Sequence, residues 1–153
     1  NLLQCSEGHI RAVFDMLKRQ KHRPVFTGGL EANMLKPWHC DLLREVKTRK
    51  MYFAYDTPDD YEPLVMAGKM LMDAGIDPLW HTMSCYNLIG YHVDTFEKAQ
   101  ERMERTIRAG FMPFAMLYRD ETGTVNKDWK KFQREWLRPA IVAKKFGEVW
   151  HKQ

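Results

Sequence analysis

Polar side chains that could take part in catalysis or binding come directly after apolar runs of this chain. Asp56 follows one run, Tyr91 and His92 follow the next, and Arg119 and Asp120 follow the one after that. A carboxylate next to an apolar strand is costly unless it faces a ligand, a cation or a cap. Asp56 is therefore predicted to contact a ligand, with a role as acid or base open to it, or to cap the turn that follows.

A pair of glycines, Gly28-Gly29, ends an earlier apolar run. A glycine-rich turn after a strand can cradle a phosphate, but neither the dinucleotide fingerprint nor the Walker loop is present. Two interpretations stay open: a turn that needs a positive φ, which is favoured, or close approach of a ligand to the backbone. The six His and three Cys show no matched pairs at zinc-ligand spacing, so no metal site is predicted.

The run ends recur at a nearly constant interval. From Thr27 to Asp56 is 29 residues, from Asp56 to Gly90 is 34, and from Gly90 to Arg119 is 29. That interval is the length of a strand plus a crossover helix, the unit of a parallel α/β sheet. Because all strands of such a sheet end at one rim, the polar residues at the run ends are expected to become neighbours there.

The elements that follow from this pattern are strands near 24–27, 51–55, 83–89 and 112–118, each followed by a helix. Leu2-Leu3 indicates the stub of a fifth strand, which would leave an exposed edge. Asp94 with Glu97 three residues later fits a capping box at the start of the helix that Gly110 closes. Helical spacing turns Gly68 inward in the helix over 61–74, and one or two helices follow residue 123.

A closed eight-stranded barrel needs about 250 residues, and this chain supplies a little over half of that. We therefore expect an α/β fold: either an open sheet or a partial (β/α) barrel, TIM-barrel-like, with four to five parallel strands, outer helices and a helical C-terminal tail. The expected domain organisation is a partial barrel over 1–120 and, in the same domain, a helical C-terminal extension over 121–153.

Composition and charge narrow the partners. The net charge is +4, and the basic runs at 44–50 and 127–131 are interrupted, so they are interpreted as solvated helix faces and nucleic acid is not expected as a partner. No apolar stretch reaches about 18 residues, so no membrane span is predicted. The three cysteines are odd in number and far apart, which favours reduced thiols and a cytoplasmic location.

The run-end segments, taken together in order, resemble a known superfamily. Residues 24–32 resemble the fourth-strand motif of radical S-adenosylmethionine (radical SAM) enzymes, and 51–56 resemble the fifth. Residues 86–91, followed by Asp94-Thr95 and a helix with Ala99 and Arg102, resemble the sixth strand and its helix. Residues 111–116 continue in the same order, and the segment before Ser6 resembles the end of the third strand. The resemblance covers about residues 1–120.

This resemblance implies chemistry that the chain does not carry alone. Superfamily members hold a 4Fe-4S cluster on a Cys-x-x-x-Cys-x-x-Cys loop, and the cluster cleaves S-adenosylmethionine to a 5′-deoxyadenosyl radical. The chain has no such loop. It is therefore expected to be the C-terminal half of such a barrel, contributing cofactor- and substrate-facing residues while the iron–sulfur cluster is held elsewhere. We expect this chain alone to hold neither cluster nor cofactor tightly.

The resemblance also nominates binding residues. It places Glu31 and Asp56 by the ribose or a small-molecule substrate, Gly90-Tyr91 by the adenine, and Arg119 by a carboxylate of the substrate or cofactor. Asn87 is an alternative residue pointing into the barrel. With the two glycines, the nominated cofactor-binding set is Gly28, Gly29, Glu31, Asp56, Asn87, Gly90, Tyr91 and Arg119.

Three interpretations of the function stay open at this point. The first is the radical SAM half-barrel, whose partner at the open edge is the missing N-terminal half or a second copy of the chain. The second is a non-catalytic, barrel-derived binding module. The third is a small α/β enzyme that uses Asp56 as acid or base.

Overall fold

Four strands alternate with helices along the chain. The computed structural model describes residues 1–78, 81–119, 121, 123 and 126–150. The strands are Val25–Leu30 (β1), Lys50–Ala54 (β2), Met83–Ile89 (β3) and Met112–Leu117 (β4). The α-helices are Glu7–Lys18 (α1), Pro37–Glu45 (α2), Tyr61–Asp73 (α3), Phe96–Arg108 (α4), Lys127–Trp136 (α5) and Pro139–Trp150 (α6). Short 3-10 helices lie at Leu2–Gln4, Ala32–Met34 and Pro58–Asp60.

The strands form one parallel sheet whose order, β1-β2-β3-β4, follows the sequence. Met51 of β2 pairs with Met83 of β3, and Ser84 pairs with Met112 of β4. The register shifts between β1 and β2 after Phe26, where β1 bulges. The expected parallel α/β architecture is confirmed, and the sheet is open rather than closed.

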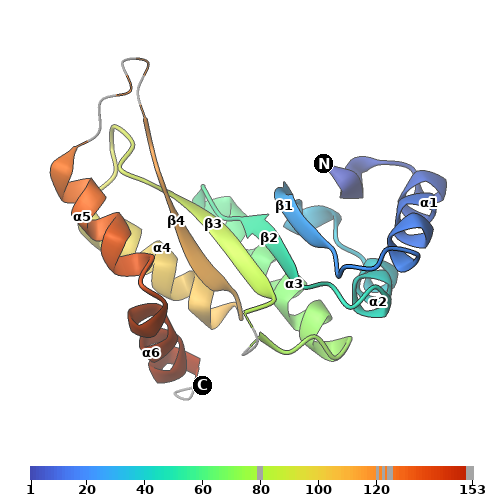
Figure 1. Cartoon of the computed structure of the whole chain (residues 1–153). Coiled ribbons are helices and arrows are strands. Elements are labelled where there is room, and N and C mark those ends of the chain that lie inside the picture. Colours follow the sequence, from blue (N-terminus) through green and yellow to red (C-terminus); the bar gives the residue numbers. More distant parts are fainter. Residues whose placement is uncertain (79–80, 120, 122, 124–125, 151–153) are drawn as a thin grey trace.

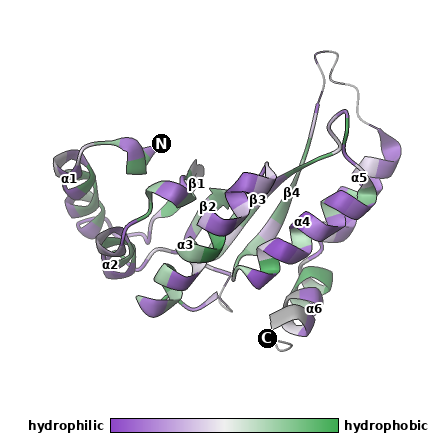
Figure 2. Cartoon of the chain, turned by 180° about the vertical axis from the view of Figure 1, so that it is seen from behind, coloured by the Kyte–Doolittle hydropathy of each residue, from purple (hydrophilic) through white to green (hydrophobic). Residues whose placement is uncertain are grey.

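The crossover helices lie on one face of the sheet. Right-handed crossovers between neighbouring strands place their helices on the same side. Figure 1 views the sheet from its uncovered face, with α3 and α4 behind it. Figure 2, turned by 180°, shows α3 and α4 in front of the strands.

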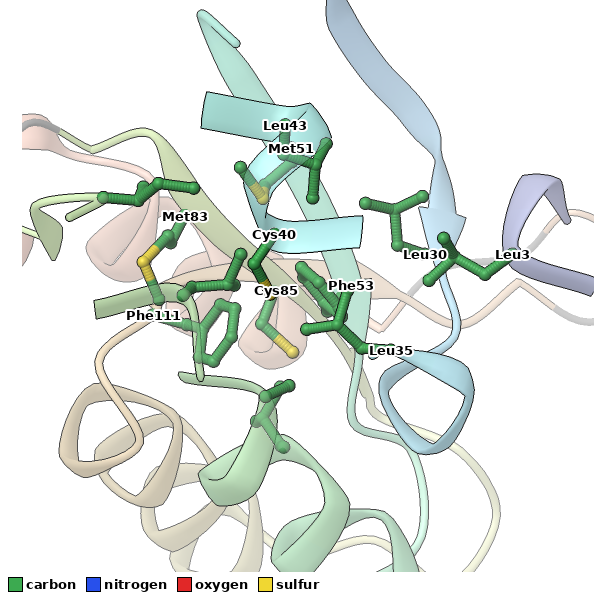
Figure 3. Packing of buried hydrophobic residues seen from close by; sticks show 14 of the residues in the cluster. Leu3, Leu30, Leu35, Cys40, Leu43, Met51, Phe53, Met83, Cys85 and Phe111 are labelled. Carbon is green, nitrogen blue, oxygen red and sulfur yellow. The ribbon is translucent and has the colours of Figure 1, made fainter. Parts of the chain in front are cut away.

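The core fills the space between the sheet and these helices. Phe53, Met83 and Cys85 from the strands are fully buried against Leu43 and Phe111 (Figure 3). A second cluster lies under the C-terminal helices and contains Ile89, Met103, Ile107, Ala115, Trp136 and Val142. Burying one such large side chain stabilises the fold by about 1.5–3 kcal/mol, so these two clusters fix the sheet that carries the rim.

The opposite face of the sheet carries an aromatic surface. Tyr52, Tyr86 and Phe114 alternate with the buried residues of β2, β3 and β4, and all three are half-buried. The rings of Tyr52 and Tyr86 stack at 4.5 Å between centroids, and Phe114 meets Tyr86 edge-on at 5.6 Å. Parallel sheets are usually covered by helices on both faces, so an uncovered face of this kind is unusual.

The expected fifth strand at Leu2-Leu3 is wrong. Residues Leu2–Gln4 form a 3-10 helix, because the Asn1 side chain caps it by accepting a hydrogen bond from the Leu3 backbone N–H at 3.2 Å. The edge of the sheet is therefore β1. Asn1 also donates from Nδ2 to the Gly29 carbonyl at 2.8 Å and so occupies part of that edge.

The helical C-terminal tail is present as α5 and α6. Helix α5 lies along β4, where Gln133 donates from Nε2 to the Ala115 carbonyl at 3.0 Å. This bond satisfies one backbone acceptor at the β4 end of the sheet. Over the residues that the structure describes, no helix combines the length and the apolar character that crossing a membrane requires.

Candidate functional site

A cleft of about 470 Å³ opens at the carboxyl ends of β1 and β2. It contains half of the nominated set, namely Gly28, Gly29, Glu31 and Asp56. Asp59 and Asp60 from the turn after β2 add two more carboxylates to its wall. Four carboxylates make this an acidic cleft, which suits hydroxyl-bearing or cationic ligands and disfavours a phosphate at Gly28-Gly29.

Asp56 ties the ends of two strands together. Its Oδ1 accepts a hydrogen bond from the Leu88 N–H of β3 at 3.2 Å. Of the hydrogen bonds formed among the described residues, none uses Oδ2, the second oxygen of this carboxylate. Asp56 is exposed as a whole residue, but partial burial of its carboxyl in the cleft raises the pKa of that group; the Leu88 N–H opposes the rise, neighbouring Asp60 adds to it, and Arg102 lowers it.

The cap of the turn after β2 is Asp60 and not Asp56. Asp60 Oδ2 accepts from the backbone N–H of Asp56 at 3.0 Å, from the Thr57 N–H at 2.7 Å and from the Thr57 hydroxyl at 3.0 Å. Both interpretations of Asp56 were open from sequence, and the geometry separates them. Because Asp60 satisfies the turn, the Asp56 side chain is left to face β3 and the cleft.

The glycines at the end of β1 leave space in the cleft. A Cβ on Gly28 would meet nothing within 4 Å, and Gly28 does not have a positive φ. Packing and backbone geometry therefore do not demand glycine at this position. Gly29 differs, since its φ of 70° favours glycine. The turn interpretation thus explains Gly29, while Gly28 is consistent with close approach of a ligand.

A buried ion pair organises the end of β3. Arg102 of α4 binds Asp94 through two bonds, Nη1 to Oδ1 at 3.0 Å and Nη2 to Oδ2 at 2.7 Å. The Asp94 side chain is fully buried and that of Arg102 is 10% exposed. Arg102 Nη2 also donates to the Leu88 carbonyl at 2.9 Å. The backbone of Leu88 therefore links the two side chains, since its N–H donates to Asp56 and its carbonyl accepts from Arg102.

The predicted capping box at Asp94 is wrong. Helix α4 begins at Phe96, and its cap is Thr95, whose hydroxyl accepts from the Lys98 N–H at 3.2 Å. Asp94 instead faces Arg102 and accepts from the Gly90 N–H at 2.9 Å. The carboxylate is drawn to the guanidinium because a bidentate charged pair is stronger than a single cap bond.

Gly90 and Tyr91 lie at the rim next to this ion pair. Gly90 has a φ of 77°, and a Cβ there would come within 2.9 Å of the Trp129 indole, so its glycine serves the fold. The Tyr91 ring lies 5.6 Å from the Arg102 guanidinium. Neither residue lines the acidic cleft. The network through Leu88 nevertheless connects their turn to Asp56.

Two nominated residues lie elsewhere. Arg119 is exposed and lines a separate cleft along β4 with Gly123 and Lys130. Asn87 is fully buried on the helix side of β3 and accepts from the Thr106 hydroxyl of α4 at 3.0 Å. The structure therefore brings neither of them to the acidic cleft. His92 is exposed, with Nε2 3.5 Å from the Tyr118 hydroxyl, and Asp120 lies outside the described residues.

The cysteines lie on separate elements. Cys5 is exposed near the N-terminus, whereas Cys40 and Cys85 are buried in the core (Figure 3). Burial raises the pKa of the Cys40 thiol to about 11 and that of Cys85 well above its usual value. Among the described residues, no group of three or more His, Cys, Asp or Glu is placed to hold a metal ion.

The sequence nominated Asp56 and Glu31, which line the acidic cleft, but it did not indicate Asp94–Arg102 as the support of the rim. The signal was available in α4, where Arg102 occupies the inward stripe between Ala99 and Thr106. A charged residue in an inward stripe requires a buried partner. Comparisons of the chain with protein-family models, with curated proteins and with solved structures give no match.

Proposed function

We propose that this chain is the C-terminal half of a radical S-adenosylmethionine enzyme with a TIM-barrel-like fold. In this proposal it contributes cofactor- and substrate-facing residues to the reductive cleavage of S-adenosylmethionine, and the 4Fe-4S cluster is held elsewhere in the complete protein. The observation that carries the proposal is the acidic cleft at the carboxyl ends of β1 and β2, the position of active sites in barrel enzymes.

The topology of the sheet supports a barrel wall. A doubly wound sheet reverses its strand order at a switch point and carries helices on both faces. Here the order follows the sequence, and the crossover helices share one face. In a completed barrel, Tyr52, Tyr86 and Phe114 on the uncovered face would point into the interior.

The acidic cleft suits the nucleoside part of the cofactor. S-adenosylmethionine carries a positive sulfonium and ribose hydroxyls, and carboxylates attract the first and accept hydrogen bonds from the second. Glu31 and Asp56 would hold the ribose, and Gly28 leaves room beside it. The Gly90-Tyr91 backbone would lie by the adenine, on a turn that Asp94 and Arg102 hold rigid.

The described residues of this chain do not fit the cluster. A 4Fe-4S cluster takes cysteine thiolates, whereas Cys40 and Cys85 are buried as thiols with raised pKa values and Cys5 stands apart. We therefore assign no step of cluster chemistry to them. In the complete protein the cofactor would supply radical chemistry, and the residues of this chain would bind it, orient it and shield it from solvent.

The decisive experiment is Asp56→Asn in the complete, cluster-loaded protein. Losing a charged hydrogen bond to the ribose should weaken S-adenosylmethionine binding roughly tenfold or more and lower the yield of 5′-deoxyadenosine. Asp41→Asn, the same change of charge on the exposed surface of α2, should leave both unchanged. If binding and cleavage are both unaffected by Asp56→Asn, the site assignment is wrong and Asp56 is structural.

The raised pKa of Asp56 favours a second candidate, a small α/β enzyme using Asp56 as acid or base. This function predicts a rate that titrates with a single carboxyl above the ordinary aspartate range. The two candidates separate on one observation. The radical enzyme requires a reductant and S-adenosylmethionine, and the acid–base enzyme turns over without either.

A further inference from the structure

Two adjoining clefts lie at the amino-terminal end of the sheet, opposite the acidic cleft. The larger, of about 680 Å³, is bounded by the end of α2, the start of β2 and the segment before β3. The smaller, of about 310 Å³, lies between the ends of α1 and α2. Arg23 and Lys47 line both clefts and so join them into one surface, which we call the basic track.

The basic track concentrates the positive charge of the molecule. It contains seven cationic side chains, Lys18, Lys21, Arg23, Arg44, Lys47, Arg49 and Lys50. Among the described residues, two carboxylates line it, Glu45 and Asp77. Glu45 is paired with Lys18 at 2.7 Å, and Arg44 is paired with Asp41 of α2, which does not line the clefts, at 3.5 Å. The seven cationic side chains exceed the two carboxylates by five charges, which is more than the net charge of +4 of the whole chain. The rest of the molecule is therefore close to neutral, and the opposite rim is acidic.

Two charged or titratable residues of the basic track have a positive φ. Lys47 has a φ of 51° and His81 a φ of 54°, and both line the larger cleft. Within the described part of the chain, these are the two residues other than glycine with a positive φ. Glycine is the residue that tolerates this conformation. At Lys47 this conformation ends α2, where the Lys47 N–H donates to the Arg44 carbonyl at 2.9 Å and the Thr48 N–H to the Leu43 carbonyl at 3.1 Å.

Hydrogen bonds to backbone carbonyls orient the Arg23 side chain without neutralising its charge. Its Nε donates to the Lys47 carbonyl at 2.6 Å and its Nη2 to the Thr48 carbonyl at 3.5 Å. Both partners are uncharged, so the guanidinium keeps its full charge while the bonds hold it in the track. The remaining N–H groups can donate to an anion, and the planar fork of arginine matches phosphate oxygens.

We propose that the basic track binds the phosphate backbone of a nucleic acid, without reading its sequence. Arg23, Lys47 and Arg49 are exposed, and exposed cations bind a single small anion weakly because water and salt screen them. A polymer of phosphates differs, since each neutralised phosphate releases condensed counterions and adds to the affinity. The spread of cations over two joined clefts matches such a polymer.

Sequence alone does not predict this partner, because the runs 18–23 and 44–50 each resemble an ordinary solvated helix end. The fold joins them through Arg23 and Lys47. The basic track lies at the end of the sheet opposite the proposed cofactor cleft. The inference is therefore independent of the proposed function, and failure of either leaves the other standing.

The test is fluorescence anisotropy of this chain with a fluorescein-labelled 20-base-pair DNA duplex over a series of salt concentrations. Binding should weaken linearly on a log–log plot with a slope on the order of −3 to −5, about −0.9 for each phosphate contacted. The double variant Lys21→Glu/Arg49→Glu should weaken binding at least tenfold and flatten the slope by about 2. Lys98→Glu/Lys127→Glu, the same charge change at the starts of α4 and α5, should stay within twofold of the parent.

The variant Lys47→Gly tests whether a loss of DNA binding comes from the lost charge and not from a change in the fold. Glycine accepts the positive φ of this position, so the backbone is preserved while one cation is lost. Weaker binding with an unchanged circular dichroism spectrum is the expected result. Three outcomes overturn the proposal: no binding to DNA at low salt, equal losses in the two double variants, or binding only to vesicles containing phosphatidylserine, which would reassign the track to a membrane surface.

Discussion

At the scale of single residues, the candidate site depends on Asp56 and Asp60 having different hydrogen-bond partners. Asp60 satisfies the turn after β2, and this leaves Asp56 to bridge to Leu88 and face the cleft. The sequence nominates Asp56 because it ends an apolar run. It does not distinguish the two carboxylates, because the choice depends on the Leu88 N–H, which comes from a different strand.

Asp56→Asn should make the protein more stable at neutral pH. Because folding raises the pKa of Asp56, the stability that its protonated form contributes is fully present below the ordinary value of 3.8 and is lost as pH rises through the raised pKa. An amide keeps the Leu88 hydrogen bond and carries no charge. Urea denaturation should show a gain at pH 7 that shrinks as pH falls toward 3.8.

Asp41→Asn on α2 is the control for that measurement, since it removes the same charge from a helix surface away from the cleft. A loss of stability at pH 7 in Asp56→Asn, or a gain that does not depend on pH, would contradict the burial argument. A variant that is more stable but binds its ligand less well would mark Asp56 as a residue kept for function at the expense of stability.

At the scale of elements, helix packing was predictable where it depends on spacing within one helix. The apolar spacing of 61–74 already turns Gly68 inward, and in α3 it is buried. The structure shows why this position is a glycine, which no local sequence pattern indicates. Gly68 lies directly against the Ala109 carbonyl and the Phe111 ring, between α4 and β4.

The wrong prediction of a strand at Leu2-Leu3 has a local cause. Asn1 caps a helical turn there, and two apolar residues are too few to define a strand.

Gly68→Ala should destabilise the protein strongly. A Cβ at this position would overlap the Ala109 carbonyl and approach the Phe111 ring to 3.1 Å, so α3 would have to move away from the turn between α4 and β4. We expect a loss of about 3 kcal/mol, the upper part of the usual range for overpacking. Gly8→Ala is the matched control, because nothing lies within 4 Å of a Cβ in that exposed turn of α1. It should be neutral or stabilise by about 0.5 kcal/mol; equal losses in chemical denaturation would refute the packing argument.

At the scale of the whole molecule, the repeat of about thirty residues was sufficient to predict a parallel sheet with strand ends at one rim. The distribution of charge was not predictable, because the acidic cleft and the basic track each collect residues from several units. The uncovered sheet face was also hidden. Tyr52, Tyr86 and Phe114 lie on β2, β3 and β4 respectively, and the register of these three strands is what makes them a continuous surface.

When the chain is studied by itself, without the rest of the proposed barrel to enclose this face, that surface predicts self-association. A parallel sheet with one open apolar face is unusual, and exposed apolar patches commonly mark contacts with other proteins. Val25 and Met116, on β1 and β4 at the two sides of this face, are each 44% exposed. Val25→Lys/Met116→Lys should therefore weaken association about tenfold or more in sedimentation equilibrium, with little change in the free energy of unfolding.

The matched control is Met66→Lys/Val93→Lys. These positions are 64% and 70% exposed but lie outside this face, so the control should leave association unchanged. A parent chain that stays monomeric at every concentration, or an equal effect of both double variants, would mean that the open face is not a contact surface.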